Sequence, residues 1–215
     1  MCIAVITGGP IYPEASAILM DAKEVYCADS GLDYCIANGI KPDRFYGDMD
    51  SVSEEGSHYL EISGIPAQTY NSEKDKTDTE LVLDNCPKDS PIILVCSLTG
   101  RIDHVVANLG LLIRFKSRGY DITATDGVSD IIPMIGPSDI TIEGDWKDGI
   151  AVSLIPFANE KVEGVTTSNL YYELNDATLE ATSSFSISNK PKKDADSFRV
   201  SIKSGRMLIT LTKPV

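Results

Sequence analysis

Two aspartates separated by one residue stand in the stretch Gly47-Asp48-Met49-Asp50-Ser51. In an extended segment alternate side chains share a face, so Asp48 and Asp50 are expected to point the same way. Such carboxylates repel one another in a low-dielectric site unless a proton or a cation lies between them. Because Mg²⁺ takes oxygen ligands from one or two carboxylates and from substrate phosphates, the pair predicts metal-assisted phosphate chemistry. The alternative is a surface turn, since Gly, Asp and Ser are common turn residues.

A second acidic position stands at the start of a predicted helix. Thr77 and Glu80 form a capping box just before an apolar run, which predicts a helix that begins near Asp78 and ends before Pro87. The free N–H groups at such a helix end could hold a phosphate while Asp78 faces a metal ion. The alternative is a well-capped surface helix that binds nothing.

A third cluster, Arg101, Asp103 and His104, follows the apolar run 91–96 and a glycine turn. Arginine suits phosphate oxygens because its fork of donors is planar and always charged. His104 and Asn108 are four residues apart and therefore share one face of a helix. The alternative is that Asp103 only caps this helix and that His104 is an ordinary polar residue.

The elements that must position these side chains alternate between strand and helix. This alternation predicts a mainly parallel sheet with helices on its faces, whose ligands bind beyond the carboxyl ends of the strands. Asp29, the pair Asp48 and Asp50, and the segment Thr7-Gly8-Gly9 all fall at such ends. Strands are predicted at 2–7, 24–28, 44–46, 65–70, 91–96 and 121–125, and helices at 13–21, 29–39, 53–63, 78–86 and 104–119. The strand at 65–70 contains Pro66 and is therefore expected near an edge of the sheet.

From Gly127 onward the pattern changes to short β-rich runs separated by turn residues, which is typical of a β-sandwich or barrel. The runs lie at 131–132, 140–142, 150–155, 170–174, 198–202 and 207–212. The sequence therefore predicts an α/β domain of residues 1–127 with a mainly parallel sheet, followed by an all-β sandwich domain of residues 128–215.

Composition restricts the partners. Hydrophobic residues make up 42% of the chain and charged residues 24%, as in ordinary globular proteins. The net charge of -13, from 32 acids and 19 bases, argues against nucleic acid or an anionic membrane as partner, so an anionic substrate is expected to bring its own cation. No apolar run approaches the roughly 18 residues that span a bilayer, and the start of the chain does not have the features of a signal peptide. Together with five cysteines that form no C-x-x-C pair, which we interpret as buried free thiols, this predicts a cytoplasmic protein.

Four segments together resemble thiamine pyrophosphokinases of the bacterial type. They are Ala28-Asp29-Ser30-Gly31, Gly47-Asp48-Met49-Asp50-Ser51, Lys74-Asp75-Lys76-Thr77-Asp78, and Thr99-Gly100-Arg101-Ile102-Asp103-His104 with Asn108. The resemblance extends to Gly164-Val165 and Ser186-Ile187-Ser188-Asn189, and it departs at Thr99, where relatives tend to have a second glycine. It implies an α/β domain followed by a β-sandwich, and transfer of a diphosphoryl group from ATP to the hydroxyethyl oxygen of thiamine. The products would be thiamine diphosphate and AMP.

The resemblance also implies three groups of site residues. The residues that would act on the phosphates are Asp48, Asp50, Asp78, Arg101, Asp103 and His104. Of these, Asp48, Asp50 and Asp78 would hold Mg²⁺, and either Asp103 or His104 would orient or deprotonate the thiamine hydroxyl. Contacting ATP and its metal are Asp29, Lys74, Asp75, Thr77 and Asn108. Contacting thiamine are Ser186, Ser188 and Asn189 in the β domain. The family further implies a homodimer with the site between its subunits.

Two other functions fit the residues alone. A metal-dependent phosphohydrolase or nucleotidyl transferase would use the same acidic pairs but would turn over ATP without thiamine. A nucleotide-sensing module would keep the fold without the chemistry. A P-loop kinase is disfavoured, because the sequence contains no G-x-x-x-x-G-K-[ST] motif.

Overall fold

The computed structural model describes residues 1–71, 75–146 and 149–214. The chain divides into two compact units, Met1–Leu111 with Gly119–Gly127, and Leu112–Arg118 with Val128–Val215. Within the described ranges, no helix is both long and apolar enough to cross a membrane.

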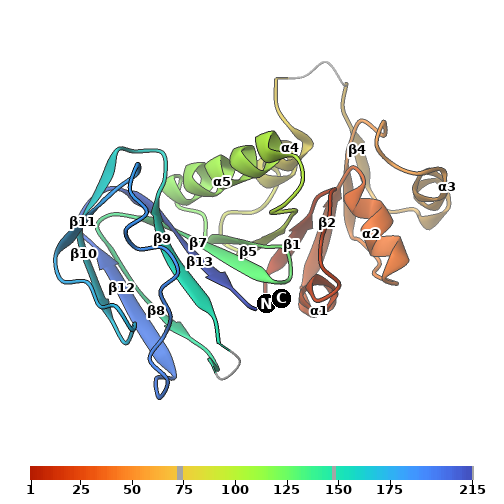
Figure 1. Ribbon diagram of the computed structural model, residues 1–215. Coiled ribbons are helices and arrows are strands. Elements are labelled where there is room, and N and C mark those ends of the chain that lie inside the picture. The colour runs from red at the N-terminus through yellow and green to blue at the C-terminus, as the bar shows by residue number, and fades with distance from the viewer. Residues whose placement is uncertain (72–74, 147–148, 215) are drawn as a thin grey trace. The chain divides into compact units, whose positions relative to one another are not determined.

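The first unit is built on six parallel strands in the order β4-β3-β2-β1-β5-β6. These strands are β1 (Ile3–Ile6), β2 (Glu24–Ala28), β3 (Arg44–Gly47), β4 (Ala67–Thr69), β5 (Ile92–Val95) and β6 (Ile122–Thr125). The helices between them are α1 (Ala15–Asp21), α2 (Gly31–Ala37), α3 (Glu54–Ser63), α4 (Asp78–Asp84) and α5 (Ile102–Ser117). Figure 1 shows α1 and α2 on one face of these strands and α4 and α5 on the other. The predicted parallel α/β domain is confirmed.

The central strand β1 explains where a ligand can bind in this unit. All four of its residues are buried, as expected for a strand covered on both faces. It pairs with β2 on one side and β5 on the other, and the helices that follow β1 and β5 lie on opposite faces. The loops after β1 and β5 therefore diverge and leave a crevice at the carboxyl end of the sheet.

The edge of this sheet is also as predicted. Strand β4 pairs only with β3 in the strand order, its three residues are exposed, and Pro66 immediately precedes it. Because proline cannot donate to a ladder, it is compatible with this edge position.

Apart from Leu112–Arg118, which include the end of α5, the second unit consists of antiparallel strands in two groups. Strand β13 (Arg206–Thr212) pairs with β7 (Ser129–Ile135) and with β9 (Ala151–Pro156). The other group has the order β11 (Ala177–Glu180), β10 (Lys161–Ser168), β12 (Ser197–Ile202) and β8 (Ser138–Glu143). Inward residues of both groups, among them Leu154, Phe198 and Ile209, share one buried cluster. The predicted β-sandwich is confirmed.

The prediction of a strand at residues 170–174 is wrong. Residues 170–174 form a loop in which Leu170 makes only an isolated bridge to Pro191. Leu170 is completely buried, so its apolar character reflects a packed loop rather than a strand. In contrast, β10 was not among the predicted runs, because the register shift between Val162 and Val165 around Gly164 interrupts its apolar alternation.

The five cysteines are free, and all except the partly exposed Cys2 are buried. Burial raises the pKa of the Cys35, Cys86 and Cys96 thiols to about 12, which keeps them protonated at neutral pH. We therefore expect a thiol reagent such as DTNB to modify one cysteine rapidly in the native protein and all five after denaturation. Rapid native modification of two or more thiols would show that the core of the first unit opens readily.

Candidate active site

A pocket of about 540 Å³ lies in the first unit, at the carboxyl end of the parallel strands. This volume is in the range of small-molecule sites. Its walls come from the loops after β1, β2, β3 and β5 and from the first residues of α4 and α5. The lining residues that carry polar side chains are Thr7, Asp29, Ser30, Ser51, Thr77, Asp78, Thr79, Ser97, Thr99, Arg101, His104 and Asn108. Among the Ser and Thr residues of this set, the sequence assigned a site role only to Thr77, although Thr7, Ser30, Ser51 and Thr99 stand in the segments singled out there. Thr79 and Ser97 have no distinctive pattern and were missed.

The loop after β1 has glycines because neighbouring loops leave no room for side chains. A Cβ atom on Gly8 would lie 2.0 Å from Ser30 Oγ, and one on Gly9 would lie 2.9 Å from Ser97 Cβ. A Cβ on Gly31 would lie 2.5 Å from the carbonyl oxygen of Ile6, so α2 can start directly beside β1. These close approaches bring the ends of β1, β2 and β5 together around one pocket.

Asp29 is held between the ends of β2 and β3. It adopts a left-handed conformation with φ 48°, which Asp tolerates better than most residues. Its backbone N–H donates to the carbonyl of Tyr46 at 3.1 Å. Its Oδ1 packs so closely on Gly47 that a Cβ there would lie 2.1 Å from it. The Asp29 side chain therefore has a fixed place in the pocket wall.

The stretch from Asp48 to Ser51 is a turn, so the expected extended segment is wrong. Met49 has a left-handed φ of 71°, and the Asp50 backbone N–H donates to Asp48 Oδ1 at 3.3 Å. The reason is that β3 ends at Gly47, after which an aspartate side chain can bond the chain two residues on and stabilise a turn. Ser51 lines the pocket, whereas Asp48 and Asp50 are not among its lining residues. Their role in holding Mg²⁺ remains a prediction.

Helix α4 begins as the capping box predicts. Thr77 is its N-cap and accepts from the backbone N–H of Glu80 at 3.3 Å, and Asp78 is the first helical residue. Thr77 and Asp78 line the pocket, and Asp75 does not. Lys74 lies outside the described residues. The helix therefore brings one predicted metal ligand and one predicted ATP contact to the pocket.

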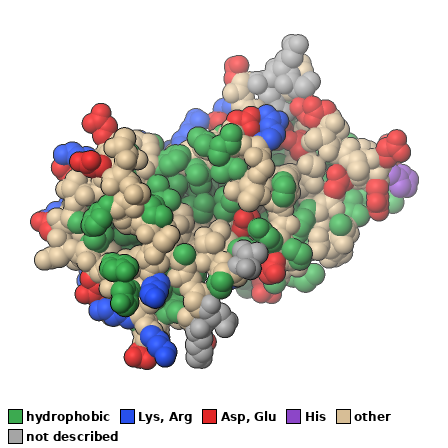
Figure 2. Space-filling view, viewed as in Figure 1, with side chains coloured by type: hydrophobic (Ala, Val, Ile, Leu, Met, Phe, Trp, Pro, Cys, Tyr) green, Lys and Arg blue, Asp and Glu red, His purple; other side chains and the backbone are tan. Residues whose placement is uncertain are grey.

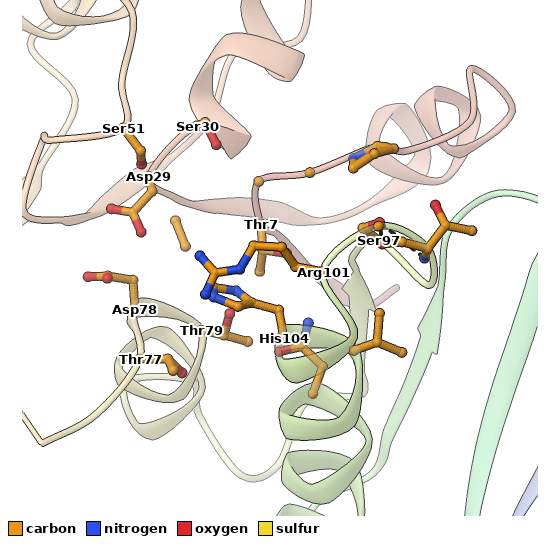
Figure 3. Close-up of a pocket in the computed structure, with 18 residues that line it drawn as sticks. Thr7, Asp29, Ser30, Ser51, Thr77, Asp78, Thr79, Ser97, Arg101 and His104 are labelled. Carbon is orange, nitrogen blue, oxygen red and sulfur yellow. Dashed lines mark hydrogen bonds between the residues drawn. The ribbon is translucent and has the colours of Figure 1, made fainter.

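Arg101 and Asp103 form an ion pair at the start of α5. Arg101 Nε lies 3.2 Å from Asp103 Oδ1, and Arg101 Nη2 lies 2.6 Å from Asp103 Oδ2. The hydrogen bonds from Arg101 lower the pKa of Asp103 to about 2. Arg101, His104 and Asn108 line the pocket, but Asp103 does not. Figure 3 shows the guanidinium of Arg101 facing the side of the pocket where Asp29 and Asp78 lie.

The turn that carries Arg101 is shaped by Ser97. Its Oγ donates to the carbonyl of Thr99 at 2.7 Å and accepts from the Thr99 N–H at 3.2 Å. Gly100 then takes a φ of 82°, which favours glycine. The turn thus accommodates Thr99, where the resemblance to the family departs, and still presents Arg101 to the pocket.

The charge around the pocket is unfavourable for a bare anion. Figure 2 shows Asp and Glu side chains on the visible face around α2, α3 and α4, with fewer Lys and Arg among them. Of the described lining residues, Arg101 is the one Lys or Arg. A phosphate-bearing ligand would therefore depend on Arg101 and on a cation that accompanies it.

The oxygen atoms of the pocket suit such a cation. Asp29 and Asp78 lie on the same side of the pocket, with the hydroxyls of Ser51 and Thr77 nearby in the same wall (Figure 3). In the described parts of the chain, no group of three or more His, Cys, Asp or Glu side chains forms a metal cluster. Because Mg²⁺ commonly binds through one or two carboxylates plus substrate phosphates, this donor set fits an ion that arrives with a triphosphate.

The predicted thiamine contacts lie together in the second unit, beside β9. The Ser186 hydroxyl donates to the Leu154 carbonyl at 2.7 Å, and the Ser188 N–H donates to Ser153 Oγ at 3.0 Å. Ser186 and Ser188 have positive φ values of 94° and 58°. The segment is therefore fixed in an unusual conformation by its bonds to the strand.

Asn189 is buried, and its side chain already has protein partners. Its Oδ1 accepts from the N–H groups of Tyr172 and Lys190, at 3.1 and 2.9 Å, and its Nδ2 donates to the Tyr172 carbonyl at 2.8 Å. The amide therefore fixes the loop that contains Tyr172. Direct contact of Asn189 with thiamine remains a prediction.

Exposed apolar side chains surround this segment, and sequence reasoning missed them. Tyr171, Tyr172 and Phe185 are 59%, 66% and 59% exposed, and Ile187 is 47% exposed. The two tyrosine rings meet edge to face at 4.8 Å. The adjacent tyrosines between turn residues were the available signal, but the run that contains them was interpreted as a strand.

The fold and the pocket place the chain in a structural class: an α/β unit with a polar, ligand-sized pocket at the carboxyl ends of its parallel strands, followed in sequence by a β-sandwich. A family model for the thiamin pyrophosphokinase catalytic domain matches residues 15–124, and a model for the thiamin pyrophosphokinase vitamin B1 binding domain matches residues 138–207. The chain belongs to the thiamine pyrophosphokinase family and is an enzyme of that family.

Individual relatives agree with this assignment. A thiamine pyrophosphokinase from Bacillus subtilis is 30% identical over 192 residues, which covers 87% of this chain and 88% of that protein. The crystal structure of a thiamine pyrophosphokinase from Bacillus subtilis superposes with a TM-score of 0.85 at 25% identity, covering 99% of both chains. The structure from Geobacillus thermodenitrificans gives 0.83 at 26% identity, covering 100% of this chain and 98% of that one.

Proposed function

We propose that this chain transfers the diphosphoryl group of ATP to the hydroxyethyl oxygen of thiamine, giving thiamine diphosphate and AMP. The observation that carries the proposal is that one chain matches both a catalytic-domain model and a vitamin B1 binding model of the same family. We further propose that residues 1–127 are the catalytic domain that binds ATP and Mg²⁺, and that residues 128–215 bind thiamine.

In the pocket, positioning and charge neutralisation do most of the work, as in other phosphoryl transfers. Asp29 and Asp78, with Asp48 and Asp50 from the adjacent turn, would hold Mg²⁺, which when bound neutralises charge on the triphosphate. Arg101 binds phosphoryl oxygens from the opposite side and stabilises the charge of the transition state. The remaining predicted ATP contacts are Lys74, Asp75, Thr77 and Asn108.

The thiamine hydroxyl must lose its proton as it attacks phosphorus. A general base works best when its pKa lies near the working pH. The pKa of Asp103 is lowered to about 2 by its bond to Arg101, so this carboxylate is a weak base at neutral pH. His104 lines the pocket, so we assign to His104 the role of accepting the proton of the thiamine hydroxyl, and to Asp103 the role of orienting Arg101.

Thiamine is a cation with flat rings and needs polar partners beside an aromatic wall. We assign the wall to the exposed rings of Tyr171, Tyr172 and Phe185, and the polar contacts to Ser186 and Ser188. Asn189 holds the Tyr172 loop in place. From the family resemblance, the working form is a cytoplasmic homodimer whose site is completed between two copies of the chain.

The test is AMP release from ATP and Mg²⁺, measured with and without thiamine. We expect AMP only when thiamine is present, in equal amount with thiamine diphosphate, and no turnover once EDTA removes the metal. Equal ATP consumption without thiamine would instead establish the phosphohydrolase alternative. No turnover under either condition would favour the sensing module or a different acceptor.

A further inference from the structure

The acidic turn, residues 48–52, is attached to the segment of α2 at both of its ends. At its start, Gly47 packs against Asp29 Oδ1, and the Asp29 N–H donates to the carbonyl of Tyr46 at 3.1 Å. At its end, Ser53 contacts Asp33, which lies four residues after Asp29. Asp29 lines the pocket directly before α2, and Ser51 of the turn lines the same pocket (Figure 3). The turn is thus fixed relative to Asp29 through two attachments.

The second attachment is made by both oxygens of the Asp33 carboxylate. Asp33 Oδ1 accepts from the Ser53 hydroxyl at 2.6 Å, and Asp33 Oδ2 accepts from the Ser53 backbone N–H at 3.1 Å. Hydrogen bonds to an ionised carboxylate are stronger than neutral ones, and two parallel bonds fix orientation as well as distance. Asp33 therefore determines the position of the residue that immediately follows the turn.

The packing around Asp33 shows how closely this contact is built. A Cβ atom on Gly56 would lie 2.6 Å from Asp33 Oδ1 and 2.6 Å from Val52 Cγ1. The Ser53 hydroxyl in turn accepts from the Gly56 N–H at 3.0 Å and caps α3. One carboxylate thereby joins α2, the end of the turn and the first turn of α3.

A purely structural role is the alternative, in which Asp33 only fastens α2 to α3. The Gly56 N–H bond that caps α3 does not need Asp33, however, since it uses an acceptor site on Ser53. Asp33 adds two hydrogen bonds, which it accepts from the hydroxyl and the backbone N–H of Ser53, directly after the last residue of the turn. Its specific effect is therefore on where the turn lies relative to Asp29.

We propose that Asp33 is a positioning residue that sets the distance between Asp29 and the acidic turn, and thereby the affinity of the pocket for a divalent cation with ATP. This rests on the proposed function of the turn and of Asp29 in binding the metal–triphosphate. Groups that orient metal ligands typically change metal affinity or activity by about 10- to 100-fold when they are removed. We expect an effect of this size from Asp33.

The experiment compares Asp33→Ala with wild type and with Asp43→Ala. Asp43 is a matched control, because its Oδ2 also accepts a backbone N–H, that of Val25 at 2.8 Å, but Asp43 is not a lining residue of the pocket. The first readout is Mn²⁺ binding in the presence of ATP without thiamine, followed by electron paramagnetic resonance. The second is the Mg²⁺ concentration that gives half-maximal AMP release, and the third is the thermal midpoint.

Asp33→Ala is expected to weaken Mn²⁺ binding about tenfold or more and to raise the Mg²⁺ requirement in parallel, with the KM for thiamine unchanged. Asp43→Ala is expected to lower the thermal midpoint and leave both metal readouts as in wild type. If Asp33→Ala does not fold, Asp33→Asn and Ser53→Ala decide the question. The Asn amide has one acceptor oxygen and can accept only one of the two hydrogen bonds from Ser53, and Ser53→Ala removes the hydroxyl that donates to Asp33 Oδ1, together with the α3 cap. These variants are expected to show the same direction with a smaller change.

The positioning role would be overturned if a folded variant that lacks the Asp33–Ser53 side-chain bond had the metal affinity and the Mg²⁺ requirement of wild type. In that case, thiamine-dependent AMP release by wild type would still support the proposed function. Failure of the proposed function looks different, because wild type itself would then release no AMP with thiamine. Mn²⁺ binding would still report on Asp33 in that case, and absence of Mn²⁺–ATP binding in wild type would overturn both ideas.

Discussion

Replacing Asp78 with Asn is expected to lower kcat for AMP release by about a hundredfold or more. Asp78 is the first residue of α4, and its carboxylate lies on the same side of the pocket as that of Asp29. Asparagine keeps the shape but removes the charge, so one of the two carboxylates among the described lining residues becomes a weaker metal ligand. The measurement is kcat at saturating thiamine, together with the Mg²⁺ concentration for half-maximal rate.

The same substitution should hardly change stability. A negative charge in the first turn of a helix contributes about 0.3–1 kcal/mol through the helix dipole, so the thermal midpoint should fall only slightly. Asp89→Asn, in the same unit and outside the pocket, is the control and should keep wild-type kcat. An Asp78→Asn enzyme with wild-type kcat and Mg²⁺ requirement would refute the assignment of Asp78 to the metal.

The sequence was a good guide to the first unit because its elements have strong local signals. Buried parallel strands such as 92–95 are nearly continuous apolar runs, and the Thr77–Glu80 capping box marks the first turn of α4. In the second unit the signals are weaker. Strand β10 is polar on one side and interrupted at Gly164, and Leu170 is a buried loop residue, so their local patterns misrepresent their structure.

Site residues were predictable from the sequence where they stand directly after a strand or at the start of a helix, because this position determines where they lie in the fold. Asp29, Asp78 and Arg101 follow strand ends or begin helices, and the parallel sheet brings all of them to one pocket. The geometry of Asp48 and Asp50 was not predictable, because it depends on the left-handed φ of Met49 rather than on strand alternation.

Contacts between side chains distant in sequence were also beyond prediction. Asp33 and Ser53 are 20 residues apart, and only the packing of α2 against α3 shows that they meet. Asn189 and Tyr172 are 17 residues apart, and the buried amide could be recognised as a clamp only from its bonds. Sequence patterns report periodicity within an element, whereas these contacts depend on how elements pack.

Replacing Arg101 with Lys is the second substitution with a large expected effect. Among the described lining residues, Arg101 is the only Lys or Arg. Its planar guanidinium presents several N–H donors in a fixed geometry that the Lys ammonium does not have. We expect kcat/KM for ATP to fall about a hundredfold in Arg101→Lys and further in Arg101→Ala. Arg44→Lys is the matched control, since Arg44 begins β3 at the opposite end of the sheet and should keep wild-type kinetics.

The partner of Arg101 determines how this prediction depends on pH. The folded pKa of Asp103 is lowered from 3.8 to about 2, so its pairing with Arg101 is fully present above 3.8 and is lost only as the pH falls through about 2. Asp103 is therefore ionised at neutral and mildly acidic pH, so we expect Asp103→Asn to lower kcat/KM for ATP by the same factor at both. The measurement is kcat/KM for ATP at several pH values in wild type and in Asp103→Asn. A ratio between the two enzymes that changes over this pH range would show that Asp103 titrates there and would make Asp103 the candidate base.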